Sequence, residues 1–138
     1  MNLPILITDN ITELLIKIIK FTQMRQRVLT ENIDNFDRPG FVPKDLMAEE
    51  FSDLLNDALN EHIQNRRLVL RDTENIKFGV NGNFEVRPIE DKDAKRLLTE
   101  NPEEYLELQL NKLFENSINE KMTKELLKQK EGLIPILE

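Results

Sequence analysis

A corner between residues 28 and 41 limits how this chain can fold. Apolar residues recur at helical spacing up to Val28, and residues 32 to 37 then include four Asn or Asp side chains. Such side chains bond to nearby backbone groups and compete with helix continuation. Pro39 and Gly40 follow, and they fit the central pair of a type II turn in which glycine takes the positive φ. We therefore expect a long helix to end here and the chain to leave in a new direction.

The segment before the corner has the pattern of an amphipathic helix over about residues 10–33. Asn10 is the expected N-cap, with Glu13 completing a capping box. One face of this helix is apolar, and its members are Ile11, Leu14, Ile18, Phe21 and Val28. Further apolar residues widen that surface beyond what one partner helix would cover, so several neighbours are expected.

The segment after the corner predicts a second helix and a small hairpin. The helix is expected over about 44–67, with Pro43 in its first turn. Apolar and polar residues then alternate over about 76–87, around an Asn81-Gly82 pair that is typical of a two-residue hairpin turn. We expect this hairpin to be a projection that needs a helix beneath it.

The last segment begins with a strong helix start. Asn101 is a cap, Pro102 suits the first helical turn, and Glu103 and Glu104 favour the positive end of the helix dipole. The helix is expected to run to about Gly132. Its apolar face is formed by Leu106, Leu110, Leu113, Phe114, Ile118, Met122 and Leu126.

These elements predict a mainly α fold in one unit spanning residues 1–138. The inner N-terminal helix (10–35) and the inner C-terminal helix (101–138) are expected to pack antiparallel, because each has an apolar stripe and their charges are complementary. Residues 1–27 hold four basic and two acidic residues, whereas residues 101–138 hold five basic and eight acidic. Residues 36–100 form the outer segment between them.

Composition excludes several classes of function. The formal net charge of −7 disfavours nucleic-acid binding and anionic membranes, and the absence of cysteine excludes disulfides and thiolate chemistry. The sequence lacks phosphate-binding glycine motifs, and its single histidine, His62, is more typical of a half-exposed helix residue than of a catalyst. We expect no catalytic residue, cofactor, metal or small-molecule substrate. Leu3 to Ile7 is too short for the apolar core of a secretory signal.

Two groups of residues, one near each end of the chain, match the motifs of a known family. At the corner, Leu29, Asn32-Ile33, Asn35 and Pro39-Gly40-Phe41 follow the Leu-x-x-Asn-Ile-Ala-Asn-x-x-Thr-Pro-Gly-Tyr signature of flagellar rod, hook and hook-associated proteins. Near the C-terminus, Leu110, Leu113 and Asn116, followed by Leu126-Leu127 and Lys130, match spacings of the family's last helix. The chain therefore resembles the bacterial flagellar basal-body rod protein family, as a divergent match in which Asp34, Arg38 and Phe41 replace the usual residues.

The resemblance implies a structural subunit of the proximal rod, which self-assembles through its terminal helices. Its implied partners are further copies, other rod proteins, and the ring and export-gate components of the basal body. The implied location is the periplasmic rod, reached through the flagellar export apparatus without a cleaved signal. Two alternatives stay open: another short rod protein of the family, or a free helical adaptor or chaperone that binds a partner helix.

Overall fold

The computed structural model describes residues 9–80 and 83–132, and within them it is mainly helical, as predicted. Its elements, in chain order, are α2 (Asn10–Asp34), β1 (Lys44–Asp45), α3 (Ala48–Asn65), β2 (Ile76–Lys77), β3 (Glu85–Val86), β4 (Ile89–Glu90), α4 (Lys92–Glu100) and α5 (Pro102–Gly132).

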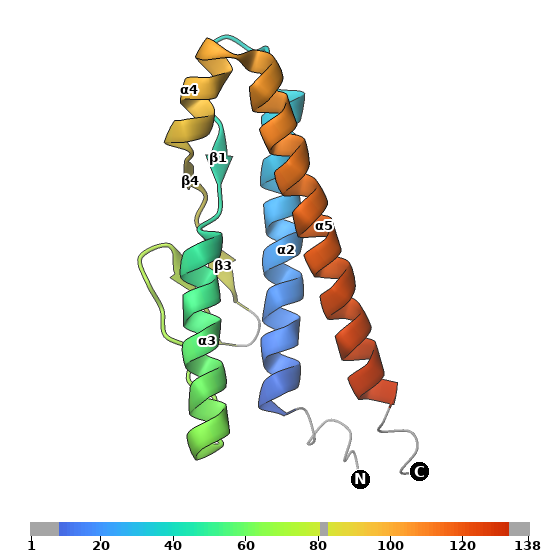
Figure 1. Cartoon of the computed structure of the whole chain (residues 1–138). Coiled ribbons are helices and arrows are strands. Elements are labelled where there is room, and N and C mark those ends of the chain that lie inside the picture. The colour runs from blue at the N-terminus through green and yellow to red at the C-terminus, as the bar shows by residue number, and fades with distance from the viewer. Residues whose placement is uncertain (1–8, 81–82, 133–138) are drawn as a thin grey trace.

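The two long helices, α2 and α5, lie side by side and run in opposite directions (Figure 1). This confirms the predicted antiparallel pairing of the terminal helices. The α3 helix lies on the other side of α2, and α4 lies at the end of the molecule where the chain turns into α5 (Figure 1). The order across the molecule is therefore α3, α2, α5, and α5 forms one edge.

The corner has the predicted geometry. Asn35 follows α2, and both its backbone N–H and its Nδ2 donate to the Glu31 carbonyl oxygen. The Phe41 N–H then donates to the Arg38 carbonyl oxygen at 3.1 Å, which closes a turn around Pro39 and Gly40. Gly40 has φ +77°, the positive value that a type II turn requires.

The helix starts differ in part from the prediction. The N-cap of α2 is Asp9, whose carboxylate accepts from the Thr12 N–H at 2.8 Å, and Asn10 is the first helical residue. Asn101 caps α5 as expected: its Oδ1 accepts from the Glu104 N–H, and its Nδ2 donates to the Glu104 carboxylate. The side-chain oxygen of Asp or of Asn can accept from the first helical N–H groups. The sequence pattern therefore fits either of the adjacent residues Asp9 and Asn10 as the N-cap.

The second helix begins later than predicted, because Lys44 and Asp45 form strand β1. This strand pairs antiparallel with β4, with Lys44 opposite Glu90 and Asp45 opposite Ile89. Pro43 is therefore not in a helical turn, and its carbonyl oxygen accepts from the Asp91 N–H at 3.0 Å. The residue pattern predicted neither β4 nor the nine-residue helix α4, because two-residue strands and a short charged helix carry little periodic signal.

The hairpin forms, but its two strands pair in a different register from the one that a two-residue turn would give. Such a turn at 81–82 would place Phe78 opposite Glu85, whereas Lys77 is opposite Glu85 and Ile76 is opposite Val86. Residues 81–82 lie outside the described residues. Gly79 has φ +64°, and a Cβ there would stand 2.3 Å from the Asn83 carbonyl oxygen, so the chain folds tightly against itself beside the strands.

The hairpin is also more than a projection, because it supplies half of an aromatic core. Phe21 of α2 stacks on Phe51 of α3 with ring centroids 4.1 Å apart. Phe78 and Phe84 close over Phe51, at 6.5 and 5.9 Å. Leu46 and Ile76 complete this buried cluster. The expected supporting helix is thus α3 together with α2, held by aromatic contacts.

We predict that Gly40→Ala lowers the free energy of unfolding by about 1 kcal/mol, because alanine pays a steric penalty at positive φ. Gly132→Ala is the matched control. A Cβ meets nothing within 4 Å at either glycine, but only Gly40 of this pair has positive φ. Urea unfolding of both variants measures the difference, and equal stabilities would show that the corner does not depend on backbone conformation.

Candidate assembly surface

The contact between α2 and α5 is a seam of polar side chains. The buried residues of α5 are Tyr105, Gln109, Asn116 and Thr123. They recur at intervals of four, seven and seven residues, so they lie along one side of the helix and face α2. A seam of this kind gains less from burial than leucines would, but its hydrogen bonds fix how the two helices are aligned.

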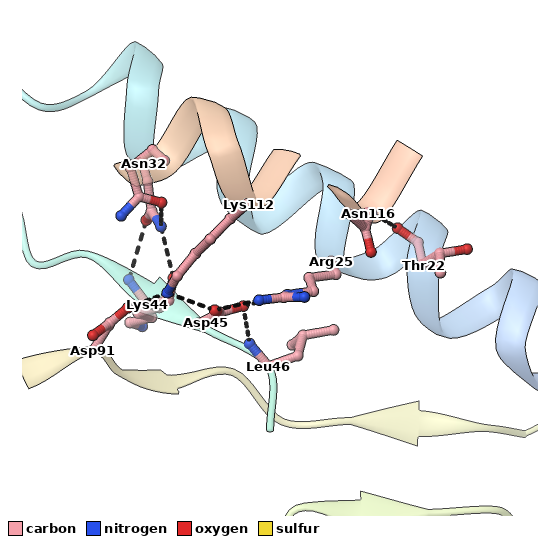
Figure 2. A network of polar contacts seen from close by, with 10 residues as sticks. Thr22, Arg25, Asn32, Lys44, Asp45, Leu46, Asp91, Lys112 and Asn116 are labelled. Carbon is pink, nitrogen blue, oxygen red and sulfur yellow. Dashed lines mark hydrogen bonds and ion pairs between the residues drawn. The ribbon is translucent and has the colours of Figure 1, made fainter. Parts of the chain in front are cut away.

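Asn32 is the centre of this seam and is 2% exposed. Its Nδ2 donates to the Lys44 carbonyl oxygen at 2.7 Å and to Gln109 Oε1 at 2.9 Å, while its Oδ1 accepts from the Lys44 N–H at 3.1 Å (Figure 2). The Tyr105 hydroxyl donates to the Asn32 backbone carbonyl at 2.8 Å. One residue of α2 therefore holds strand β1 and two residues of α5.

The seam continues along α5 through bonds to backbone oxygens. Asn116 is 2% exposed, and its Nδ2 donates to the Thr22 carbonyl oxygen at 2.7 Å. At the far end, Lys130 forms an ion pair with Asp9, the N-cap of α2. Gln109 Nε2 is buried without a hydrogen-bond partner among the described residues, which costs roughly 1–3 kcal/mol. The seam thus favours a defined alignment over maximal stability.

A network of charges next to Asn32 joins four segments of the chain. Arg25 of α2 donates to both carboxylate oxygens of Asp45 in β1, at 2.9 and 3.0 Å. Lys112 of α5 binds Asp45 at 3.0 Å and Asp91 at 2.8 Å (Figure 2). Asp91 also caps α4 through the Ala94 N–H. Because these side chains are mostly buried, losing one partner leaves a charge uncompensated.

The surroundings shift the pKa values of Asp45, Lys112 and Tyr105. Burial alone would raise the pKa of Asp45, but hydrogen bonds and charge from Arg25 and Lys112 outweigh it and hold that pKa below its ordinary value. Burial alone would lower the pKa of Lys112, but Asp91 and Asp45 raise it instead. Burial, together with the Asp91 charge, raises the pKa of Tyr105 to about 12.

The outward side of α5 is apolar and exposed. Among the described residues, five of the large exposed apolar side chains lie on this helix: Leu110 at 54%, Phe114 at 68%, Ile118 at 43%, Met122 at 60% and Leu126 at 54%. We expected the whole apolar face of α5 to pack on α2, and for these five exposed residues this is wrong. The helix is rotated so that its amides and hydroxyls face α2, where α2 offers polar partners.

The motif residues of the corner divide into buried and surface positions. Leu29 is fully buried and Asn32 nearly so, whereas Pro39 and Gly40 are exposed. Ile33, Asn35 and Phe41 are half-buried. The remaining residues named for packing are buried or half-buried, and they are Ile11, Leu14, Ile18, Phe21, Val28, Leu106, Leu113 and Leu127.

Sequence reasoning missed the polar residues that join the elements: Asp45, Asp91, Tyr105, Gln109 and Lys112. A weak signal existed, because residues 105, 109, 112 and 116 follow the same heptad spacing as a helical seam. Polar side chains at this spacing are equally typical of a solvent-exposed face, so the pattern alone does not distinguish the two. His62, set aside as a catalyst, lies 3.0 Å from the Asn10 side-chain amide, with its Nδ1 facing α2.

No helix in residues 9–80 and 83–132 combines the length and apolarity needed to cross a membrane. The same residues contain no group of three or more His, Cys, Asp or Glu side chains placed to hold a metal ion. Comparisons with protein-family models, with curated proteins and with solved structures gave no match. Among the described residues, the polar seam between α2 and α5 and the exposed apolar side of α5 are therefore the features that indicate a function.

We predict that the single tyrosine of the chain titrates near pH 12 in the folded protein and near pH 10 in the unfolded chain. Because the unfolded chain loses this proton first, stability falls as pH rises above about 10, by about 1.4 kcal/mol per pH unit from this group. The raised pKa of Lys112 adds to the same alkaline loss.

Ultraviolet absorbance of the phenolate reports the titration directly. Tyr105→Phe should make the alkaline loss of stability less steep while leaving the Lys112 part in place. A midpoint near 10 in the folded protein would mean that Tyr105 is not held as the structure places it. At acid pH the lowered pKa of Asp45 acts in the other direction, and its contribution is lost as pH falls below about 4.

Proposed function

We propose that this chain is a structural subunit of the bacterial flagellar basal-body rod, similar to the proximal rod protein FlgB, and that it catalyses no reaction. The proposal joins the resemblance at both ends of the sequence to one structural observation. The α5 helix uses a polar side for α2 and leaves its large apolar side chains exposed on the outside. Exposed apolar surface of this extent is typical of a subunit that has neighbours in its working state.

The arrangement of those side chains favours several neighbours over one. Leu110, Phe114, Ile118, Met122 and Leu126 are spaced four residues apart. An α-helix turns about 100° per residue, so each step of four advances about 40° around the axis. From Leu110 to Leu126 the apolar row therefore turns by about 160°. One straight partner helix covers a narrower stripe, so complete burial needs at least two neighbours, as in a tube of packed helices.

The corner supports the same proposal. Asn32, Leu29 and Asn35 match the family signature, and here Asn32 aligns α2, β1 and α5 while Asn35 ends α2. These residues thus set the direction in which the outer segment leaves the paired helices. A subunit that must present an inner and an outer surface at the same time requires such a fixed angle.

As a rod subunit, the chain would assemble with further copies, with other rod proteins and with ring and export-gate components, in the periplasmic part of the basal body. It would leave the cell through the flagellar export apparatus without a cleaved signal. A second short rod protein, FlgC, usually reads Asn-Leu-Ala-Asn and lacks the proline before glycine, so Ile33 and Pro39 favour FlgB. A free helical adaptor would need one partner helix, which the turning apolar row does not fit.

The test is whether purified hook–basal bodies of the organism that encodes this chain contain it. We expect the wild-type chain to be present, and Met122→Asp to be secreted but absent from basal bodies, with swimming lost. Met122 is 60% exposed, so the variant should fold. Asn60→Asp adds the same charge to an exposed position on α3, which lies on the other side of α2 from α5 (Figure 1), and should swim normally.

Two results would contradict the proposal. Absence of the wild-type chain from purified basal bodies, with retention inside the cell, would favour the adaptor. Normal swimming of the Met122→Asp strain would remove the exposed row of α5 from assembly. Circular dichroism of both purified variants establishes that the fold is kept.

A further inference from the structure

The outward side of α5 carries a second heptad row, in addition to the seam that faces α2. Its members are Glu103, Glu107, Leu110, Phe114, Ser117, Lys121, Lys124 and Lys128, at alternating intervals of four and three residues. All eight are exposed. This outer seam precedes the corresponding positions of the α2-facing seam by two residues, which places it on a different side of the helix. Figure 1 shows α5 at the edge of the molecule.

The chemistry of the outer seam is ordered along the helix. Two glutamates come first, then the large apolar Leu110 and Phe114, then the small Ser117, and finally three lysines. When the order of side chains along the outer seam is compared with the same order reversed, each position faces a side chain that complements it. Glu103 falls opposite Lys128, Glu107 opposite Lys124, Leu110 opposite Lys121, and Phe114 opposite Ser117. Acid meets base at both ends, and a large ring meets a small side chain near the centre.

We propose that the outer seam binds the outer seam of a second copy of this chain, with the two α5 helices antiparallel. A parallel pair in register would place Glu103 opposite Glu103, Phe114 opposite Phe114 and Lys128 opposite Lys128, and like charges in direct contact oppose pairing. The antiparallel pair is self-complementary, and the two-fold axis passes between Phe114 and Ser117. The Lys121 stem covers Leu110 while its ammonium group reaches solvent.

Three neighbouring acids lie beside the lysine end of the outer seam. Lys124 forms an ion pair with Glu120 of its own chain at 2.7 Å, and its side chain remains 53% exposed, so it can contact a second carboxylate. Glu125 lies one turn from both Lys121 and Lys128 on the same helix. Glu131 lies one turn from Lys128. These acids flank the outer seam whereas the three lysines lie on it, so the lysines are the groups that face the two glutamates of the second copy.

The contact is closed by its two-fold axis and cannot propagate. If the chain is a rod subunit, all copies in the rod point the same way, so this contact belongs to free subunits and not to the assembled rod. It covers Leu110 and Phe114, two of the exposed apolar side chains. The consequence for assembly rests on the proposed function, whereas the dimer itself does not.

The experiment is sedimentation equilibrium of the full chain at low ionic strength, over a range of concentrations. The wild type should form a dimer and no larger species. E103K and K128E should each weaken the dimer about tenfold, because each converts two ion pairs per dimer into like-charge contacts. The double variant E103K/K128E should restore wild-type affinity, since opposite charges face each other again.

F114D places a carboxylate at the apolar centre and should leave a folded monomer, because Phe114 is 68% exposed. N119D adds the same charge outside the outer seam and should dimerise as the wild type does. A wild type that is monomeric at all concentrations, or single reversals with unchanged affinity, overturns the proposal. A concentration-dependent ladder of larger species also overturns it, since it indicates a head-to-tail contact. Swimming and basal-body content test the rod function independently.

Discussion

The hydrogen bonds of Asn32 hold α2, β1 and α5 together. A single buried amide satisfies both backbone groups of Lys44 and reaches Gln109, and the carbonyl of the same residue accepts from Tyr105. Strand β1 has two residues and pairs with an equally short strand, so it gains little from sheet hydrogen bonds. Its position depends on this side chain. Through β1, the charges of Arg25, Asp45, Lys112 and Asp91 are brought into contact.

The polar seam and the apolar outer surface of α5 have a common physical origin. Because amides such as Gln109 and Asn116 face α2, the large apolar side chains of α5 remain on the outside. A leucine seam would have given a more stable free subunit with no surface left for neighbours. The arrangement gives up some stability of the single chain for a defined alignment of the helices and leaves an apolar surface exposed, as the proposed assembly requires. The buried, unpartnered Gln109 Nε2 fits that balance.

Periodicity and turn chemistry predicted the larger elements well. The long helices have 3.6-residue patterns over many turns, and the Pro39-Gly40 turn has strict backbone requirements, so both could be read from residue types alone. The rotation of α5 about its own axis could not be predicted from residue types alone. Its apolar row and its polar row are both regular, and which of them faces α2 depends on hydrogen-bond partners that Thr22 and Asn32 supply from a distant part of the chain. Strands β1 and β4 were missed for a related reason, since two residues carry no period.

Native-state hydrogen exchange of the Lys44 amide tests the central role of Asn32 most directly. This amide lies at an exposed residue in a two-residue strand, yet it donates to a buried side chain. The account predicts that it exchanges only on global unfolding, with protection comparable to that of the Phe51 amide in α3. In Asn32→Ala it should become about 100-fold less protected relative to Phe51, the loss expected when local opening no longer requires unfolding of the whole chain. A Lys44 amide that exchanges rapidly in the wild type, or one that keeps its protection relative to Phe51 in Asn32→Ala, would contradict it.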